Sequence, residues 1–174
     1  MSTLTSLVLP TTEAELWRYS RISELNLGDY RAAAVPTRVV GATASSDSQI
    51  DLDAVSSEAA DVFEAYNSEH AQVVRVATTR GEVVGDPVVV EHALDESDVV
   101  CTPLLEIDAA ENSEITVVER FTSDDSVRSL VIPSVRIRAA QSARVTYVQV
   151  NELGRATWSI GYQRTSGQTG RAHV

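Results

Sequence analysis

The segments Leu105–Ala110 (LEIDAA) and Val135–Ala140 (VRIRAA) match each other at an offset of thirty residues. Ile115–Glu119 (ITVVE) and Val145–Gln149 (VTYVQ) match at the same offset. A fixed period of a few tens of residues, with β-branched residues at equivalent positions, is typical of stacked strand units. One unit cannot bury its apolar face alone, so its neighbours must cover it. The repeat predicts a parallel β-solenoid; two copies alone are also compatible with a β-sandwich.

The repeat belongs to a valine-rich region that follows His70 and whose short apolar runs are separated by turn residues. We expect strands at residues 73–77, 83–90, 102–107, 114–121, 129–132, 135–138, 144–150 and 156–162. The tail 164–174 has no apolar pattern and is not expected to cap the solenoid. An uncapped last rung exposes a strand edge, which favours self-association.

The part of the chain before this region has helical signals. Thr12 and Glu15 form a capping-box pattern, which predicts a short helix over the residues that follow. Apolar residues at helical spacing predict a second helix over residues 56–68. The sequence therefore divides into a helical N-terminal module with a linker (residues 1–70) and solenoid rungs (residues 71–174).

Composition excludes several classes of function. The net charge is −11, so the chain lacks the basic surface that nucleic-acid binding needs. All 14 basic residues are arginine, so a P-loop lysine and a Schiff-base lysine are both absent. Cys101 is the only cysteine, which excludes an internal disulfide. No apolar run has the length of a membrane span and the N-terminus lacks a secretory signal, so a cytoplasmic location is expected.

The candidate chemical groups favour structure over catalysis. His70, His92 and Cys101 have spacings that match no known metal-ligand pattern, and Cys101 is interpreted as a small buried apolar residue. Glu119 could pair with another carboxylate for hydrolysis. Its position is taken by Gln149 in the next repeat, however, so we interpret it as part of a polar ladder between stacked strands. No catalytic, cofactor-binding or metal-binding residue is assigned.

Trp17, Arg18 and Tyr19 are the candidate interaction residues. Two aromatic side chains that flank a cation on a short helix can dock a partner, with the arginine pairing a carboxylate. The same residues can instead pack the helix onto the β region. Both interpretations remain open at the level of sequence.

Several segments resemble the SufB/SufD family of iron–sulfur cluster assembly, and SufD proteins in particular. Glu15–Ser20 (ELWRYS) resembles the aromatic-basic motif near the start of SufD chains, and Asp61–Asn67 (DVFEAYN) resembles the helix before their β-helix. Thr102–Phe121 and Val131–Tyr147 are similar to the first rungs, and Asn151–Gln163 to the stretch that follows. The segments occur in the family's order and cover almost the whole chain.

The resemblance implies a right-handed parallel β-helix behind a small helical module, acting as a non-catalytic scaffold. In this family, SufB and SufD subunits assemble with SufC, which binds and hydrolyses ATP, so this chain alone would hold no cofactor. A lone cysteine fits SufD better than SufB. Leu104 stands where family members often carry arginine. Family chains are about twice as long, so the later rungs and the C-terminal SufC-binding helices are expected to be absent here.

Two other functions fit the residues. An acidic β-solenoid could bind a protein or carbohydrate surface, with Tyr147, Trp158 and Tyr162 as the available aromatic side chains. A small jelly-roll enzyme of the cupin type would need histidines and a carboxylate around a metal, and His92 alone lies in the strand region. The binding solenoid is the alternative to the scaffold function.

Overall fold

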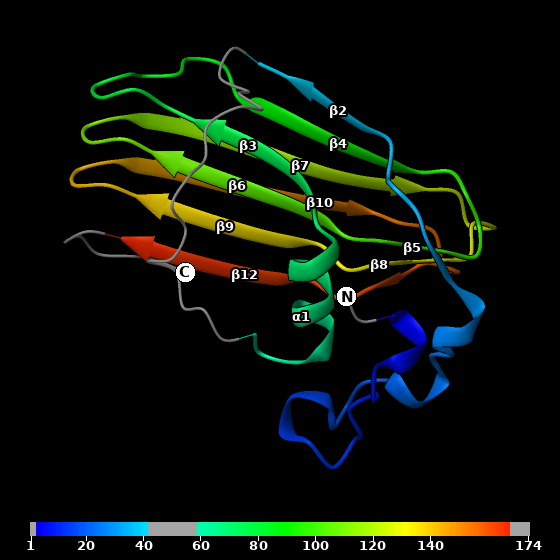
Figure 1. Ribbon diagram of the computed structural model, residues 1–174. Coiled ribbons are helices and arrows are strands. Elements are labelled where there is room, and N and C mark those ends of the chain that lie inside the picture. The colour runs from blue at the N-terminus through cyan, green and yellow to red at the C-terminus, as the bar shows by residue number, and fades with distance from the viewer. Residues whose placement is uncertain (1–2, 42–58, 168–174) are drawn as a thin grey trace.

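Three four-stranded sheets form the faces of a solenoid in the computed structural model, which describes residues 3–41 and 59–167 (Figure 1). The first sheet contains β1 (Arg31–Ala32), β5 (Val99–Cys101), β8 (Ser129–Val131) and β11 (Trp158–Ser159). The second contains β2 (Thr37–Val40), β4 (Val88–Leu94), β7 (Glu114–Ser123) and β10 (Arg144–Glu152). The third contains β3 (Gln72–Ala77), β6 (Pro103–Ala109), β9 (Ser134–Ala139) and β12 (Tyr162–Gly167).

The strand register confirms the predicted solenoid. Ile107 pairs with Ile137, and Ile115 pairs with Val145, so matched residues of the thirty-residue repeat lie on neighbouring parallel strands. Among the described strand pairs only β2 and β4 run antiparallel. The chain therefore climbs through one strand of each sheet before it starts the next rung, and about three turns are built in this way.

Apolar side chains from the second and third sheets meet inside the solenoid. Successive residues of a strand point to opposite faces, and one face of each strand turns inward. The buried members of this cluster are Val76, Val88, Val90, Leu105, Ile107, Ala109, Ile115, Val117, Val135 and Ile137. Each rung covers the apolar side chains of the rung beside it, which is why a repeat that cannot fold alone is stable in a stack.

Two of the predicted strands differ from those observed. The strand expected at residues 83–90 is β4, which begins at Val88, and Val83 makes only an isolated bridge to Glu114. The strand expected at residues 156–162 is two strands, β11 and β12. β12 reaches Gly167, so part of the expected tail is a rung paired with β9. The sequence of β12 is polar and lacks an alternating apolar pattern, so its strand conformation follows from its pairing with β9.

The helical N-terminal part is smaller than expected. It consists of four short 3-10 turns, η1 (Leu4–Ser6), η2 (Glu15–Trp17), η3 (Ile22–Glu24) and η4 (Leu27–Asp29). The capping box was wrong: η2 begins after Ala14, and no side chain caps it. Leu4, Ile22 and other apolar residues of these turns pack against α1 and the first sheet, so burial and not helix propensity holds this segment.

The one α-helix of the described chain, α1 (Val62–His70), begins later than predicted. The carboxylate of Asp61 accepts hydrogen bonds from the backbone N–H groups of Phe63 and Glu64, at 2.9 and 3.2 Å, and so fixes the start. Ala59 and Ala60 precede the helix, and residues 56–58 of the expected range lie outside the described residues.

α1 lies beside the third sheet, where β9 and β12 begin (Figure 1). Its side chains form hydrogen bonds with residues of successive rungs. Phe63 is fully buried, and the Asn67 amide donates to the backbone carbonyls of Pro103 and Ile132, at 3.1 and 2.6 Å. Glu64 pairs with Arg164 of β12 at 2.5 Å. The helix therefore joins three consecutive rungs from outside.

Replacing Asn67 with alanine is expected to destabilise the fold. The substitution removes both hydrogen bonds to buried carbonyls and leaves a cavity, so we expect a loss of about 2 kcal/mol or more in the free energy of unfolding. Chemical denaturation followed by circular dichroism measures it. Ser68→Ala, at the neighbouring exposed position, removes a hydrogen bond with Arg136 and should cost less than about 1 kcal/mol. Equal losses in the two variants would contradict the docking role of Asn67.

Gly154 offers a second test of the packing between rungs. An added Cβ there would lie 2.1 Å from the carbonyl oxygen of Asp124, so the two turns would have to separate. We expect Gly154→Ala to lower the free energy of unfolding by about 1–3 kcal/mol. Gly85→Ala is the control, because an added Cβ meets no atom within 4 Å. Unchanged stability of Gly154→Ala in the same denaturation experiment would contradict the close approach of these turns.

Candidate functional site

The interior of the solenoid contains a buried pair of ionisable side chains in the second sheet. His92 of β4 and Glu119 of β7 are 2% and 1% exposed. The imidazole Nε2 lies 3.1 Å from the Glu119 Oε1, and the imidazole ring stacks on Phe121 at a centroid distance of 4.7 Å. A buried carboxylate requires hydrogen-bond partners, and His92 supplies the first.

The other side of the His92 ring is held by the antiparallel strand β2. The Thr37 hydroxyl lies 2.9 Å from Nδ1 of His92. The Thr37 hydroxyl donates to the Val35 carbonyl at 3.1 Å, and the side-chain amide of Gln72 donates to the same carbonyl at 2.9 Å. These bonds hold Thr37 beside the His92 ring.

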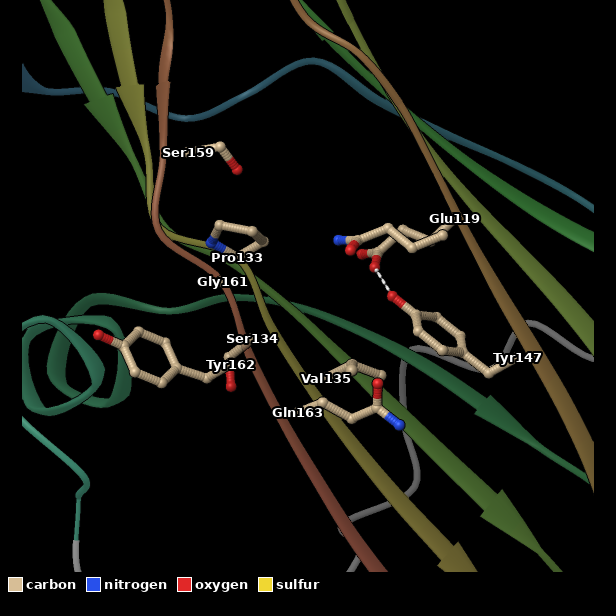
Figure 2. A pocket seen from close by; sticks show the side chains of 10 residues that line it. Glu119, Pro133, Ser134, Val135, Tyr147, Ser159, Gly161, Tyr162 and Gln163 are labelled. Carbon is tan, nitrogen blue, oxygen red and sulfur yellow. Dashed lines mark hydrogen bonds between the residues drawn. The ribbon is translucent and has the colours of Figure 1, made fainter. Parts of the chain in front are cut away.

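Tyr147 of β10 is the second hydrogen-bond partner of Glu119. Its hydroxyl donates to the Glu119 Oε2 at 2.5 Å (Figure 2). Burial, and then the nearby charge of Glu119, raise the pKa of Tyr147 well above the ordinary tyrosine value. Thr37, His92, Glu119 and Tyr147 thus form one chain of hydrogen bonds across the four strands of the second sheet, and we call these four residues the polar relay.

The polar relay ends at a cavity of about 340 Å³ between β10 and the last strands of the other two sheets. Figure 2 shows Glu119, Tyr147 and Gln163 around this space, with the Glu119–Tyr147 hydrogen bond at its edge. The cavity is lined by Glu119, Pro133, Ser134, Val135, Tyr147, Gln149, Ser159, Gly161, Tyr162 and Gln163. Its lining therefore combines amide, hydroxyl and carboxylate groups with a few apolar side chains.

Sequence reasoning identified part of this site. Gln149 pairs with Glu119 in the strand register, so the predicted alignment of these residues on stacked strands is confirmed. The bonds from Glu119 to His92 and Tyr147 were missed, because they run diagonally between rungs. His92 is registered opposite Phe121, two residues along β7 from Glu119. The one available signal was that β4, β7 and β10 each carry a polar side chain at an inward position, namely His92, Glu119 and Tyr147.

The candidate interaction residues Trp17, Arg18 and Tyr19 do not form one cluster. Trp17 packs its ring against Phe63 of α1 at a centroid distance of 5.6 Å. Arg18 is exposed, and Tyr19 is 95% exposed. Leu16, on the same turn, is 81% exposed. Trp17 thus has the packing role, and its neighbours present an exposed surface.

Cys101 and the histidines occupy separate surroundings. Cys101 is buried as expected, and burial together with Glu96 and Asp95 raises the pKa of its thiol to about 11. The ring of His70 lies 4.3 Å from that of Tyr66, and His173 falls outside the described residues. Within residues 3–41 and 59–167 no group of three or more histidine, cysteine or acidic residues is placed to hold a metal ion.

No described helix is both long and apolar enough to span a membrane. Comparison of the chain with protein-family models, with curated proteins and with solved structures gave no match.

The raised pKa of Tyr147 predicts a pH dependence of stability. The folded state holds this proton more tightly than the unfolded state, in which the pKa is near 10.0, so the stabilisation is present below pH 10 and is lost as the pH rises above it. Tyr147→Phe should therefore lose less stability between pH 9 and pH 11 than the unmodified chain, by denaturant titration. Tyr19→Phe, at an exposed position, should behave like the unmodified chain. An alkaline loss in Tyr147→Phe as large as in the unmodified chain would contradict this role.

Proposed function

We propose that the chain is a non-catalytic scaffold module of the SufB/SufD type, which works by docking other subunits of an iron–sulfur cluster assembly complex. The observation that carries the proposal is the end of the solenoid formed by β10, β11 and β12. Each of these is the terminal strand of its sheet, and all three run parallel to the strands beside them. Among the described residues, the outer edges of these three strands pair with no other strand, so this end could accept another β-structure.

The fold and the order of the family-like segments support this function. The SufB/SufD resemblance implies a parallel β-helix behind a small N-terminal helical part, and the described chain has this arrangement. The resemblance to the first rungs falls on β6, β7 and β9, which are inner strands of their sheets, and on the start of β10. The segment that resembles the helix before the β-helix contains the Asp61 cap and most of α1.

The outer edge of β12, which pairs with no strand of the described chain, shows how such docking would work. The backbone N–H of Tyr162 donates to the Pro133 carbonyl at 3.0 Å. In a parallel pair, alternate residues bond to the same neighbour, so the N–H groups of Gln163 and Thr165 point away from β9. Unpaired N–H and C=O groups along an edge strand are a template for pairing with another chain.

The exposed side chains of the N-terminal turns provide a second contact surface. Leu16 and Tyr19 lie beyond the Trp17–Phe63 contact that anchors the turn. Exposed aromatic and aliphatic side chains on an anchored segment are suited to burial against a partner. In the interior, by contrast, Glu119 is held by hydrogen bonds with His92 and Tyr147, which favours a structural role for His92 and Glu119.

Affinity capture tests the proposal. The tagged chain is co-expressed with the SufB-like and SufC-like subunits of the same source, and each subunit is scored separately. We expect SufB to be retained without SufC, because the SufC-binding helices of the family have no counterpart in the resemblance. ATP and a cluster should not co-purify with the chain alone. A folded chain that retains neither subunit would contradict the proposal.

An edge variant shows whether retention uses β12. Thr165→Pro removes an N–H that faces the free edge without removing a bond to β9, so SufB retention should fall severalfold. Thr165→Ala keeps the N–H and should retain SufB like the unmodified chain. Circular dichroism establishes that both variants are folded. Equal retention of SufB by the two variants would contradict docking at this edge.

A further inference from the structure

The outer edge of β10 carries backbone groups that pair with no strand of the described chain. β10 is the last strand of the second sheet, and its other edge pairs with β7. The backbone N–H of Arg144 donates to the Ser113 carbonyl, just before β7, at 2.8 Å. Alternate residues of a parallel strand bond to the same neighbour, so the groups of the residues between them point outward. These outward groups belong to Val145, Tyr147, Gln149 and Asn151.

The outer face of β10 has opposite charges at its two ends. Arg144 lies four residues before Val148 and Glu152 four residues after it, so the three side chains share one face of the strand. The side chains of Arg144 and Glu152 are 81% and 49% exposed, and Val148 is 42% exposed. Arg144 lies 3.7 Å from Glu114 of β7, and Glu152 accepts from Arg120 at 2.5 Å. A guanidinium has five N–H donors and a carboxylate about four acceptor sites, so each group retains capacity for a second partner.

We propose that the outer edge of β10 binds a second copy of the chain, with the two β10 strands antiparallel about a two-fold axis at Val148. Such an axis makes the contact self-complementary, since each copy presents the same residues to the other. Arg144 of each copy then faces Glu152 of the other, and the two Val148 side chains meet at the centre. Opposite charges and apolar β-branched side chains at facing positions favour antiparallel pairing. An axis moved by one residue places Arg144 opposite Val150 or Gly154, so the charges specify the register as well as the partner.

The backbone groups of β10 agree with this register. In an antiparallel pair, residues that exchange two hydrogen bonds alternate with residues that exchange none. With Val148 on the axis, the bonded pairs are Tyr147 with Gln149 and Val145 with Asn151, which are the residues whose groups point outward. This inference concerns the chain alone and does not require the proposed scaffold function. Its tests therefore use the purified chain without other subunits, and their failure leaves the capture experiment unaffected.

Two charge variants test the contact by sedimentation equilibrium of the full chain over a range of concentrations. We expect the unmodified chain to form dimers. Arg144→Glu makes carboxylates face each other and Glu152→Arg makes guanidinium groups face each other, so each variant should dimerise at least about tenfold more weakly. In an equimolar mixture of the two variants every facing pair again has opposite charges, so dimers should return. An unmodified chain that stays monomeric up to about 1 mM, or a mixture that associates no more tightly than either variant alone, would overturn the proposal.

Control variants show whether the contact uses β10. Arg38→Glu reverses an exposed charge on β2, at the opposite edge of the same sheet, and should change the dimer affinity less than about threefold. Gln149→Pro removes an outward N–H without removing a bond to β7 and should abolish dimers, whereas Gln149→Ala should retain them. Circular dichroism establishes that the variants are folded. Equal losses in Arg38→Glu and Arg144→Glu, or in the two Gln149 variants, would overturn pairing through β10.

Discussion

The parallel pairing of strands at a fixed register is the constraint on which the rest of this structure depends. Ile107 lies beside Ile137 and Ile115 beside Val145, so inward apolar side chains of one rung meet equivalent ones in the next. Side chains alternate between faces, and a slip of one residue would therefore turn the whole apolar set of a strand outward. The register thus determines the apolar interior, the corners that α1 covers and the alignment of the polar relay.

The polar relay places hydrogen-bonding groups in this apolar interior without leaving them unsatisfied. Thr37, His92, Glu119 and Tyr147 each contribute to a continuous chain of bonds across the second sheet. The antiparallel strand β2 is joined to β4 in two ways. Its backbone pairs with β4, and the Thr37 hydroxyl is hydrogen-bonded to the His92 ring. Burying the Glu119 side chain is costly, and its hydrogen bonds with His92 and Tyr147 offset part of that cost.

The sequence was sufficient to predict the fold class because the repeat can be recognised in the sequence itself. Apolar residues of β6 and β7 recur thirty residues later in β9 and β10. It was insufficient where pairing alone defines the structure. β12 is polar, and its strand conformation follows from its ladder with β9. The Thr12–Glu15 pattern failed as a cap because tertiary burial of Leu4 and Ile22 fixes the N-terminal turns. The diagonal contact of His92 with Glu119 depends on a register offset that a single sequence does not reveal.

In β6 and β9, and in β7 and β10, residues thirty positions apart are neighbours on parallel strands. Nuclear Overhauser contacts between backbone protons of β6 and β9, and of β7 and β10, measure this directly. We predict the contact pattern of parallel strands, with Ile107 opposite Ile137 and Ile115 opposite Val145. An antiparallel pattern, or a register displaced by one residue, would contradict the solenoid and with it the cavity and the docking edges.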